Sequence, residues 1–270
     1  MINLNDYEFA DRATFECGQC FRWVENHGEY VGIAGKKICK ISDGILACPD
    51  EDNGFWREYF CLDMDYQAMK DELLERDATL KGCMDYGLGI RILKQDLWET
   101  VVSFIISANN NIPRIRKIVE GLCQSFGESV EFEGKIYYTF PTPQKLAELS
   151  VEDLAHLKAG YRDKYILDAA HKFANGIISY ESLLKMQTGE ARKKLMEIKG
   201  VGGKVADCIL LFSLSRYEVF PKDVWIKRIM NKVYKVEEKE VLSFAEKTFG
   251  RYGGFAQQYL FYYYRDNSKG

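Results

Sequence analysis

The sequence predicts an α+β protein in which an antiparallel sheet precedes a larger, all-helical part. Residues 13–49 alternate apolar and polar side chains over short distances and are interrupted by turn sequences, a pattern typical of antiparallel strands. From Lys94 onward the apolar residues recur instead at the spacing of amphipathic helices. We therefore place an N-terminal antiparallel sheet domain at residues 1–92 and a helical domain packed against it at residues 93–270.

Turn and cap residues define the individual elements. The sheet is divided at Asn26-His27-Gly28, Ala34-Gly35 and Asp43-Gly44, which are residue types that tight hairpin turns favour. In the helical part, Asn111 or Ile112 is expected at a helix start, with Pro113 in the first turn, where a missing N–H costs nothing. Further helix starts are predicted at Thr142-Pro143 and at Ser150, which forms a capping-box pattern with Asp153.

Composition excludes several classes of protein. With 47% hydrophobic residues in a chain of 270, there is enough apolar material for a sizeable core, which excludes intrinsic disorder. No apolar run approaches the roughly 20 residues of a membrane helix, and the first residues do not resemble a signal peptide, so we expect a soluble cytosolic or nuclear protein. The eight cysteines include one CxxC pair, Cys17 and Cys20, so neither a disulfide framework nor a zinc site is expected.

Charge is distributed unevenly along the chain. The net charge is -3, but residues 1–92 contain 10 basic and 18 acidic residues, whereas residues 93–270 contain 27 and 22. Between Lys193 and Lys235 there are 10 basic and 4 acidic residues. Such a basic segment suits a polyanion, although an ordinary lysine-rich helical surface would give the same count.

The segment Leu195–Cys208 predicts a helix-hairpin-helix. Two helical patterns are joined by Gly200-Val201-Gly202, and so tight a turn requires backbone dihedrals that glycine tolerates. The N–H groups of the turn and of the second helix's first residues lack intrahelical partners and suit a phosphate of nucleic acid, without reading its sequence. A simple αα-hairpin with a glycine turn remains the alternative.

Lys204 and Asp223 are the candidate catalytic residues. Lys204 and Cys208 are four residues apart and share one face of the second helix. A helix N-terminus and an apolar pocket both disfavour the ammonium form of a lysine, which favours an amine nucleophile. Asp223 precedes another helical pattern at an N-cap position and could stabilise a developing cation. Considered alone, Lys204 could equally bind phosphate and Asp223 could serve only as a cap.

Five motifs, in order, resemble the helix-hairpin-helix DNA glycosylases of base-excision repair, and within them the 8-oxoguanine DNA glycosylases. They begin with Gly18-Gln-Cys-Phe-Arg-Trp23, Ile106-Ser-Ala-Asn-Asn-Asn-Ile-Pro-Arg114 and Gly160-Tyr-Arg162. The fourth motif is the hairpin with the downstream segment Phe220-Pro-Lys-Asp-Val-Trp225. The fifth is the segment Phe255-Ala-Gln-Gln-Tyr-Leu-Phe261. The resemblance covers almost the whole chain and implies a TBP-like N-terminal sheet domain before the helical glycosylase domain.

The resemblance also implies a role for each matching residue. Lys204 would be the nucleophile and Asp223 the essential aspartate. The flipped lesion would lie in a pocket made by Gly18, Cys208, Gln257 and Phe261. The opposite cytosine and the vacated space in the duplex would face Asn109, Arg114, Tyr161 and Arg162. Phosphates would bind at Gly200, Val201, Gly202 and Trp225. Without the resemblance, Phe261 would be assigned to core packing and both arginines to solvated helix ends.

The implied activity is excision of 8-oxoguanine opposite cytosine in double-stranded DNA, by base flipping and Schiff-base chemistry, followed by β-elimination. The implied protein is a monomer in the cytoplasm or nucleoid of a bacterium, or the nucleus of a eukaryote. No iron–sulfur cluster is expected, because no cysteine cluster follows Cys208. A monovalent cation could bind the carbonyls of Met196, Ile198 and Val201.

Three positions depart from the pattern of the family. Trp225 replaces a frequent histidine, Cys20 replaces a serine, and Lys199 replaces a usual proline, which should loosen the hairpin turn. Two other functions remain as alternatives. One is an alkylated-base glycosylase of the same fold, which would lack the nucleophilic lysine, and the other is a noncatalytic helix-hairpin-helix protein that binds DNA.

Overall fold

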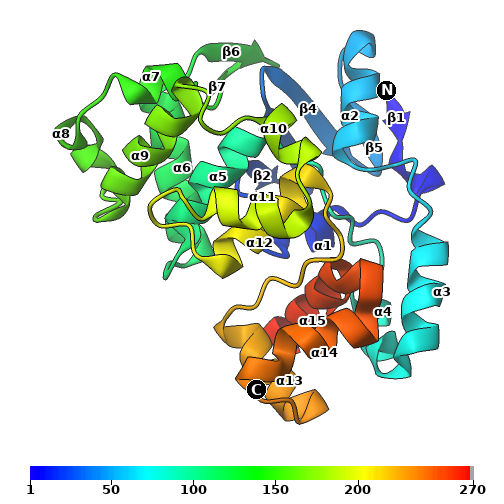
Figure 1. The fold of residues 1–270 in the computed structure, drawn as a ribbon. Coiled ribbons are helices and arrows are strands. Elements are labelled where there is room, and N and C mark those ends of the chain that lie inside the picture. The colour runs from blue at the N-terminus through cyan, green and yellow to red at the C-terminus, as the bar shows by residue number, and fades with distance from the viewer. Residues whose placement is uncertain (268–270) are drawn as a thin grey trace.

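The computed structural model describes residues 1–267 and has the predicted α+β architecture, with a sheet beside a larger helical body (Figure 1). The sheet is antiparallel throughout and has the order β1-β5-β4-β3-β2. Its strands are β1 (Ile2–Asn3), β2 (Trp23–Asn26), β3 (Glu29–Ala34), β4 (Lys37–Ser42) and β5 (Ile45–Ala47).

All three predicted turns join neighbouring strands of this sheet. At the β2–β3 turn, His27 and Gly28 have φ of 53° and 84°, and at the β4–β5 turn Asp43 and Gly44 have φ of 51° and 74°. Two successive positive φ values give the turn whose twist matches that of the flanking strands. The turn residues identified in the sequence therefore fix the register of the sheet.

The prediction of strand structure from residue 13 was wrong, because α1 (Asp11–Glu16) is helical. Alternating apolar residues in so short a segment do not distinguish a strand from one turn of buried helix. Tertiary contacts decide the outcome: the Thr14 hydroxyl donates to the Gly89 carbonyl at 3.2 Å, and the Phe15 ring stacks on Trp23 at 4.0 Å. The rest of the N-terminal region forms α2 (Asn53–Tyr59), α3 (Tyr66–Arg76) and α4 (Lys81–Tyr86).

The helical body begins with α5 (Leu97–Ser107) and α6 (Ile112–Phe126). Its expected caps are confirmed: Asn111 caps α6, Thr142 caps α7 (Pro143–Ala147), and Ser150 forms a capping box at α8 (Val151–Leu154). The remaining helices are α9 (Arg162–Ala174), α10 (Tyr180–Lys185), α11 (Thr188–Leu195), α12 (Gly203–Leu214), α13 (Val224–Tyr234), α14 (Val241–Phe249) and α15 (Gly253–Asn267).

A short hairpin that the sequence analysis did not predict interrupts the helical body. Strands β6 (Ser129–Phe132) and β7 (Lys135–Tyr138) pair antiparallel across Glu133 and Gly134, both of which have positive φ. Figure 1 shows this hairpin beside the β3–β4 part of the sheet. The ion pair between Lys40 of β4 and Glu133, at 2.8 Å, connects the two.

Two hydrophobic cores lie side by side. One joins residues of the sheet and α2, among them Phe15, Trp23 and Trp56, with Leu93. The larger core contains the helical body and also residues of α3 and α4. A boundary at residues 92/93 stays a prediction, and α3 and α4 pack with the helices rather than with the sheet.

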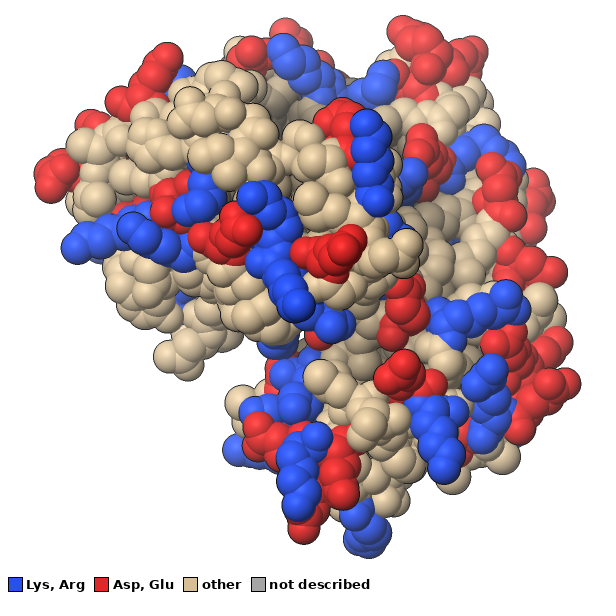
Figure 2. All heavy atoms as spheres, viewed as in Figure 1, with Lys and Arg blue, Asp and Glu red and all other residues tan. Residues whose placement is uncertain are grey.

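The surface reflects the uneven charge of the chain. Figure 2 shows many carboxylates along the edge formed by α2 and α3, and basic side chains over α11 and the lobe that carries α13 and α14. The surface is hollowed between that lobe and the one carrying α11 and α12. Within residues 1–267, no helix combines the length and the apolar content needed to cross a bilayer.

Gln19 links α1 to residues 91–93, the segment that leads into the helical body. Its buried amide donates to the carbonyls of Thr14 at 2.9 Å and Arg91 at 2.7 Å, and its oxygen accepts from the Leu93 N–H at 2.8 Å. Gln19→Leu leaves these buried groups unpaired, so we expect it to lower the free energy of unfolding by about 2–4 kcal/mol. Urea unfolding measures this, with exposed Gln67→Leu as the control, and equal stability of the two variants would contradict the role of Gln19.

Candidate active site

Six of the residues predicted from the sequence line a single cavity. The cavity lies where α12 and α15 meet the loop before α13 and the segment after α1. Its predicted lining residues are Gly18, Lys204, Cys208, Asp223, Gln257 and Phe261. Residues separated by more than 240 positions thus face one another, as the resemblance implied for the pocket and the catalytic pair.

Lys204 lies in the first turn of α12, where the N-cap is Gly202. Its Nζ is 5.2 Å from the centre of the Phe104 ring, which is itself stacked on Phe212 at 5.5 Å. Both rings line the cavity with Cys17, Pro221 and Gln258, and the sequence analysis assigned none of these five to the site. The spacing of apolar residues identifies Phe104 and Phe212 only as buried residues of a helix. No signal in the sequence therefore distinguished these two residues of the cavity from ordinary core residues.

Cys208 lies one helical turn beyond Lys204 and is 3% exposed. Burial raises the pKa of its thiol to about 11, although the neighbouring Lys204 acts in the opposite direction. The thiol is therefore protonated at neutral pH and is not a competing nucleophile. It presents a small, neutral surface on the wall of the cavity.

Asp223 is the N-cap of α13, as predicted. Its Oδ1 accepts the Ile226 N–H at 2.7 Å, which fixes the side chain at the helix start. The carboxylate lines the same cavity as Lys204. Asp223 can therefore cap α13 and face the cavity at the same time, and the hydrogen bond of the cap orients its carboxylate.

Two hydrogen-bond acceptors of the cavity have no partner in the protein. Gln257 is 5% exposed, and within residues 1–267 its Oε1 is buried without a hydrogen bond. Among the described residues, no protein donor reaches the Gly18 carbonyl, whereas its neighbours Cys17 and Gln19 accept from Gln258 and Gln95. A buried acceptor without a donor is costly, so Gln257 Oε1 suits a ligand that brings a donor, and the Gly18 carbonyl is free to accept a second one.

Phe261 nearly closes this cavity. A Cβ on Gly18 would lie 3.5 Å from the Phe261 ring, so the ring rests directly on the Gly18 backbone. The remaining volume is about 40 Å³, which is room for roughly one water molecule. The cavity in this structure is therefore too small for a purine and has to widen before one enters.

The helix-hairpin-helix consists of α11, a turn at residues 196–202 and α12. Gly200 has φ of +84°, and a Cβ there would overlap the Tyr165 ring, so both backbone conformation and packing require glycine. Gly202 has open space where a Cβ would lie, which leaves the turn accessible to a phosphate. The Val201 N–H already donates to the Ile198 carbonyl at 3.0 Å, so its phosphate contact stays a prediction.

The turn has an anchor at Lys199 that the sequence did not reveal, and the expected loosening of the turn stays a prediction. The Lys199 backbone N–H donates to Asp168 Oδ2 of α9 at 2.8 Å, a bond that proline could not make. Met196 is exposed beside this turn. Trp225, at the start of α13, is 39% exposed, with the Arg228 guanidinium 5.8 Å from its ring.

The four residues predicted to face the opposite base lie on two adjoining segments. Asn109 is exposed with φ of +50°, and Tyr161 is also exposed. Arg114 is exposed and donates to the Lys158 carbonyl at 3.0 Å. Arg162, by contrast, is 4% exposed and donates to the carbonyls of Ala108 and Asn109. It is therefore no solvated helix end, and its predicted contact with cytosine requires these bonds to be exchanged.

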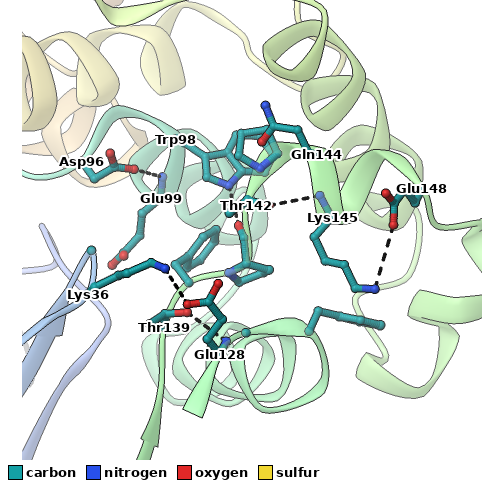
Figure 3. Close-up of a pocket in the computed structure, with 16 residues that line it drawn as sticks. Lys36, Asp96, Trp98, Glu99, Glu128, Thr139, Thr142, Gln144, Lys145 and Glu148 are labelled. Atoms are coloured by element: carbon teal, nitrogen blue, oxygen red, sulfur yellow. Dashed lines mark hydrogen bonds and ion pairs between the residues drawn. The ribbon is translucent and has the colours of Figure 1, made fainter. Parts of the chain in front are cut away.

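A larger cavity, of about 750 Å³, lies elsewhere, between the β3–β4 turn, the start of α5, the ends of the β6–β7 hairpin and α7 (Figure 3). None of the residues predicted for the site lines it. Four carboxylates and two lysines do, and the lysines already pair with carboxylates, Lys36 with Glu128 at 2.6 Å and Lys145 with Glu148 at 4.0 Å. This excess of carboxylates disfavours a phosphate.

Metal ligands are not clustered in the part of the chain that the structure describes. Within residues 1–267, no group of three or more histidine, cysteine, aspartate or glutamate residues is arranged to hold a metal ion. The cavity itself offers an amine, a carboxylate and an unpaired acceptor, from Lys204, Asp223 and Gln257.

Comparison with known families divides the chain into two matched regions. Residues 1–101 match the family described as 8-oxoguanine DNA glycosylase, N-terminal domain. Residues 102–250 match the HhH-GPD superfamily of base excision DNA repair proteins.

Three known proteins are similar to this chain over most of their own length. The structure of MBOgg1 with a low affinity DNA ligand is 46% identical, with a TM-score of 0.93 over 97% of this chain and 94% of that one. The 8-oxoguanine glycosylase/lyase of Clostridium acetobutylicum, solved with double-stranded DNA containing cytosine opposite 8-oxoguanine, is 42% identical, with a TM-score of 0.90 over 96% and 93% of the chains. An N-glycosylase/DNA lyase of Saccharomyces cerevisiae is 32% identical over 87% of this chain and 71% of its own.

Proposed function

The chain belongs to the 8-oxoguanine DNA glycosylases of the HhH-GPD superfamily, and we propose from this membership that the Lys204 cavity excises 8-oxoguanine opposite cytosine and then cleaves the strand. The observation that carries the proposal is the pair of unpaired acceptors, Gly18 carbonyl and Gln257 Oε1, in the cavity that also holds the lysine and the aspartate. The enzyme is a DNA glycosylase with lyase activity, and its partner is double-stranded DNA.

Recognition follows from the donors of the lesion. Oxidation of guanine at C8 places a hydrogen on N7, where guanine has only an acceptor. The Gly18 carbonyl accepts this hydrogen, while Gln257 Oε1 accepts from the N–H groups of the Watson–Crick edge. Phe261 and Cys208 pack on the two faces of the flipped base. Flipping costs a few kcal/mol of stacking and pairing, and these contacts offset it.

The chemistry uses the two catalytic side chains in sequence. The neutral amine of Lys204 attacks the anomeric carbon, the C–N bond to the base breaks, and the base leaves with the bonding electrons. Positive charge develops on the sugar, and the carboxylate of Asp223 stabilises it in a site from which water is excluded. The lysine–sugar adduct opens to a Schiff base. Loss of a proton from the adjacent carbon then expels the 3′ phosphate by β-elimination.

The duplex is held by the exposed residues around the cavity. Asn109 fills the space left by the flipped base, Tyr161 wedges beside it, and Arg114 and Arg162 donate to O2 and N3 of the orphaned cytosine. Phosphates bind the backbone of Gly200, Val201 and Gly202 and the indole N–H of Trp225.

Neither step of the proposed reaction requires a cofactor. A monovalent cation would suit the carbonyls of Met196, Ile198 and Val201. A carbonyl oxygen has two lone pairs, so Ile198 retains one after accepting the Val201 N–H. Such an ion would support the turn without entering the reaction. The enzyme acts as a monomer where the genome is, in the nucleoid of a bacterial cell or the nucleus of a eukaryotic one.

Lys204→Gln should abolish base excision while leaving the affinity for a lesion-containing duplex close to that of the unmodified protein, because the cavity and the hairpin are untouched. Borohydride reduction provides the test, since only a lysine Schiff base is trapped as a covalent protein–DNA adduct. We expect an adduct with the unmodified protein and none with the variant. An adduct or appreciable excision with Lys204→Gln would exclude Lys204 as nucleophile, and excision without trapping in both proteins would favour an alkylated-base type of glycosylase.

Asp223→Asn should reduce the single-turnover rate of excision by about 10²- to 10³-fold, because it removes the charge that stabilises the cationic sugar. Asparagine caps a helix as well as aspartate does, so the melting temperature should be nearly unchanged. Asp223→Ala serves as the matched comparison, since it loses the cap as well and should cost about 1 kcal/mol of stability. A near-normal rate in a folded Asp223→Asn variant would show that the carboxylate is only a cap.

Excision opposite cytosine should exceed excision opposite adenine by about tenfold or more, because adenine presents a donor where cytosine has an acceptor and leaves a guanidinium unpaired. Arg114→Ala should reduce this preference while retaining more activity opposite cytosine than Lys204→Gln does. Single-turnover rates on duplexes with each of the four opposite bases measure the effect. Equal rates on all four with the unmodified protein would show that the arginines do not read the opposite base.

A further inference from the structure

The hairpin turn rests on α9 at two adjacent positions. The Gly200 backbone lies against the Tyr165 ring so closely that any side chain at residue 200 would overlap it. One residue earlier, the Lys199 N–H donates to Asp168 Oδ2 at 2.8 Å. Tyr165 and Asp168 are both on α9, so the same helix surface receives the turn by packing and by a hydrogen bond.

The Asp168 carboxylate is held in place by further charges. Its side chain is 15% exposed, and it accepts from Lys172 Nζ, one helical turn along, at 2.6 Å. The ammonium of Lys199 approaches its other oxygen to 3.8 Å. Burial opposes ionisation, but the two lysines and the Lys199 N–H prevail and hold the pKa of Asp168 below its usual value. The bond to the turn is therefore a charge-assisted one, which is the stronger kind.

The first turn of α9 and the residue before it are connected to the residues proposed to face the opposite base. The Tyr165 ring packs edge-on against Tyr161 at 5.7 Å, and the Arg162 guanidinium lies 4.5 Å from the centre of the Tyr161 ring. Arg162 in turn donates to the carbonyls of Ala108 and Asn109 at 2.5 and 3.0 Å. A continuous series of contacts thus runs from the hairpin turn through α9 to the loop that carries Asn109.

We propose that Asp168 is a positioning residue, which fixes the phosphate-binding turn at a set distance from the residues that occupy the opened duplex. This inference rests on the proposed function of both surfaces. A duplex must reach the phosphate site and the Asn109 loop at the same time, so a turn that is already fixed on α9 binds without a further loss of conformational freedom. Asp168 touches neither Lys204 nor Asp223, and its effect is on DNA binding rather than on chemistry.

Lys199→Pro and Lys199→Ala form a matched pair that isolates the bond. Both lose the ammonium group, but only proline loses the N–H that Asp168 accepts. We expect Lys199→Pro to bind a duplex with 8-oxoguanine opposite cytosine about tenfold more weakly than Lys199→Ala does, which corresponds to one charge-assisted hydrogen bond. The single-turnover excision rate at saturating DNA should be the same for the two variants.

Asp168 variants keep the inference testable should the proline variant not fold. Asp168→Asn retains an oxygen that accepts the N–H and should bind more tightly than Asp168→Ala. Asp168→Ala should weaken DNA binding when it is combined with Lys199→Ala. It should cause no further loss of DNA affinity when it is combined with Lys199→Pro, because the hydrogen bond is already absent in that variant. A lower melting temperature with unchanged DNA affinity would show a purely structural role and overturn the inference. Equal affinities of Lys199→Pro and Lys199→Ala would also overturn it, whereas failure of the unmodified protein to excise 8-oxoguanine would instead contradict the proposed function.

Discussion

The contact of α15 with residues 16–19 is the one on which the site depends. Gln258 donates to the Cys17 carbonyl at 3.3 Å, and Arg265 donates to the Glu16 carbonyl at 2.5 Å, so the C-terminal helix is attached on both sides of Phe261. Between these bonds, the Phe261 ring rests on Gly18. This contact brings two walls of the cavity together, although they come from the first and last parts of the chain.

Two helix starts supply the proposed catalytic pair, Lys204 and Asp223, for different physical reasons. Lys204 is in the first turn of α12, a helix in which most residues are buried, so the lysine is presented on a rigid support. Asp223 is outside α13, at its cap, where the hydrogen bond to Ile226 orients the carboxylate. Phe104, from α5, lies behind the lysine and fixes its surroundings through the stack on Phe212. The geometry of the pair thus follows from helix packing rather than from a flexible loop.

The helix caps could be predicted from the sequence because they depend on interactions between neighbouring residues. The caps Asn111, Thr142, Ser150 and Asp223 formed as expected, because a side-chain oxygen beside free N–H groups needs no distant partner. The helix α1 and the burial of Arg162 were not predicted, since each depends on contacts far along the chain, such as Thr14 with Gly89. The β6–β7 hairpin was also missed, although its strand pairing is local and its turn at Glu133 and Gly134 could have been recognised. Lys204, Cys208 and Asp223 were singled out from the residue pattern. Gly18, Gln257 and Phe261 were assigned to the cavity only through resemblance to a family, because spacing alone does not distinguish Phe261 from a core residue.

Because the cavity is small, the binding of a flipped base has two parts. The first is the free-energy cost of widening the cavity, and the second is the discrimination between the lesion and normal bases. The cavity has to widen before any purine enters, so this cost lowers the affinity for all flipped bases alike. Under the proposed function, discrimination arises afterwards, at the Gly18 carbonyl. Gln257 is satisfied by the Watson–Crick edge of guanine as well as by that of the lesion, whereas the Gly18 carbonyl is satisfied only by a hydrogen on N7. With guanine, two acceptors would face each other, at a cost of about 1–3 kcal/mol, or roughly tenfold to a hundredfold in binding. If the proposed function is right, selectivity for the damaged base therefore depends mainly on one main-chain oxygen, that of Gly18, which no side-chain substitution can remove.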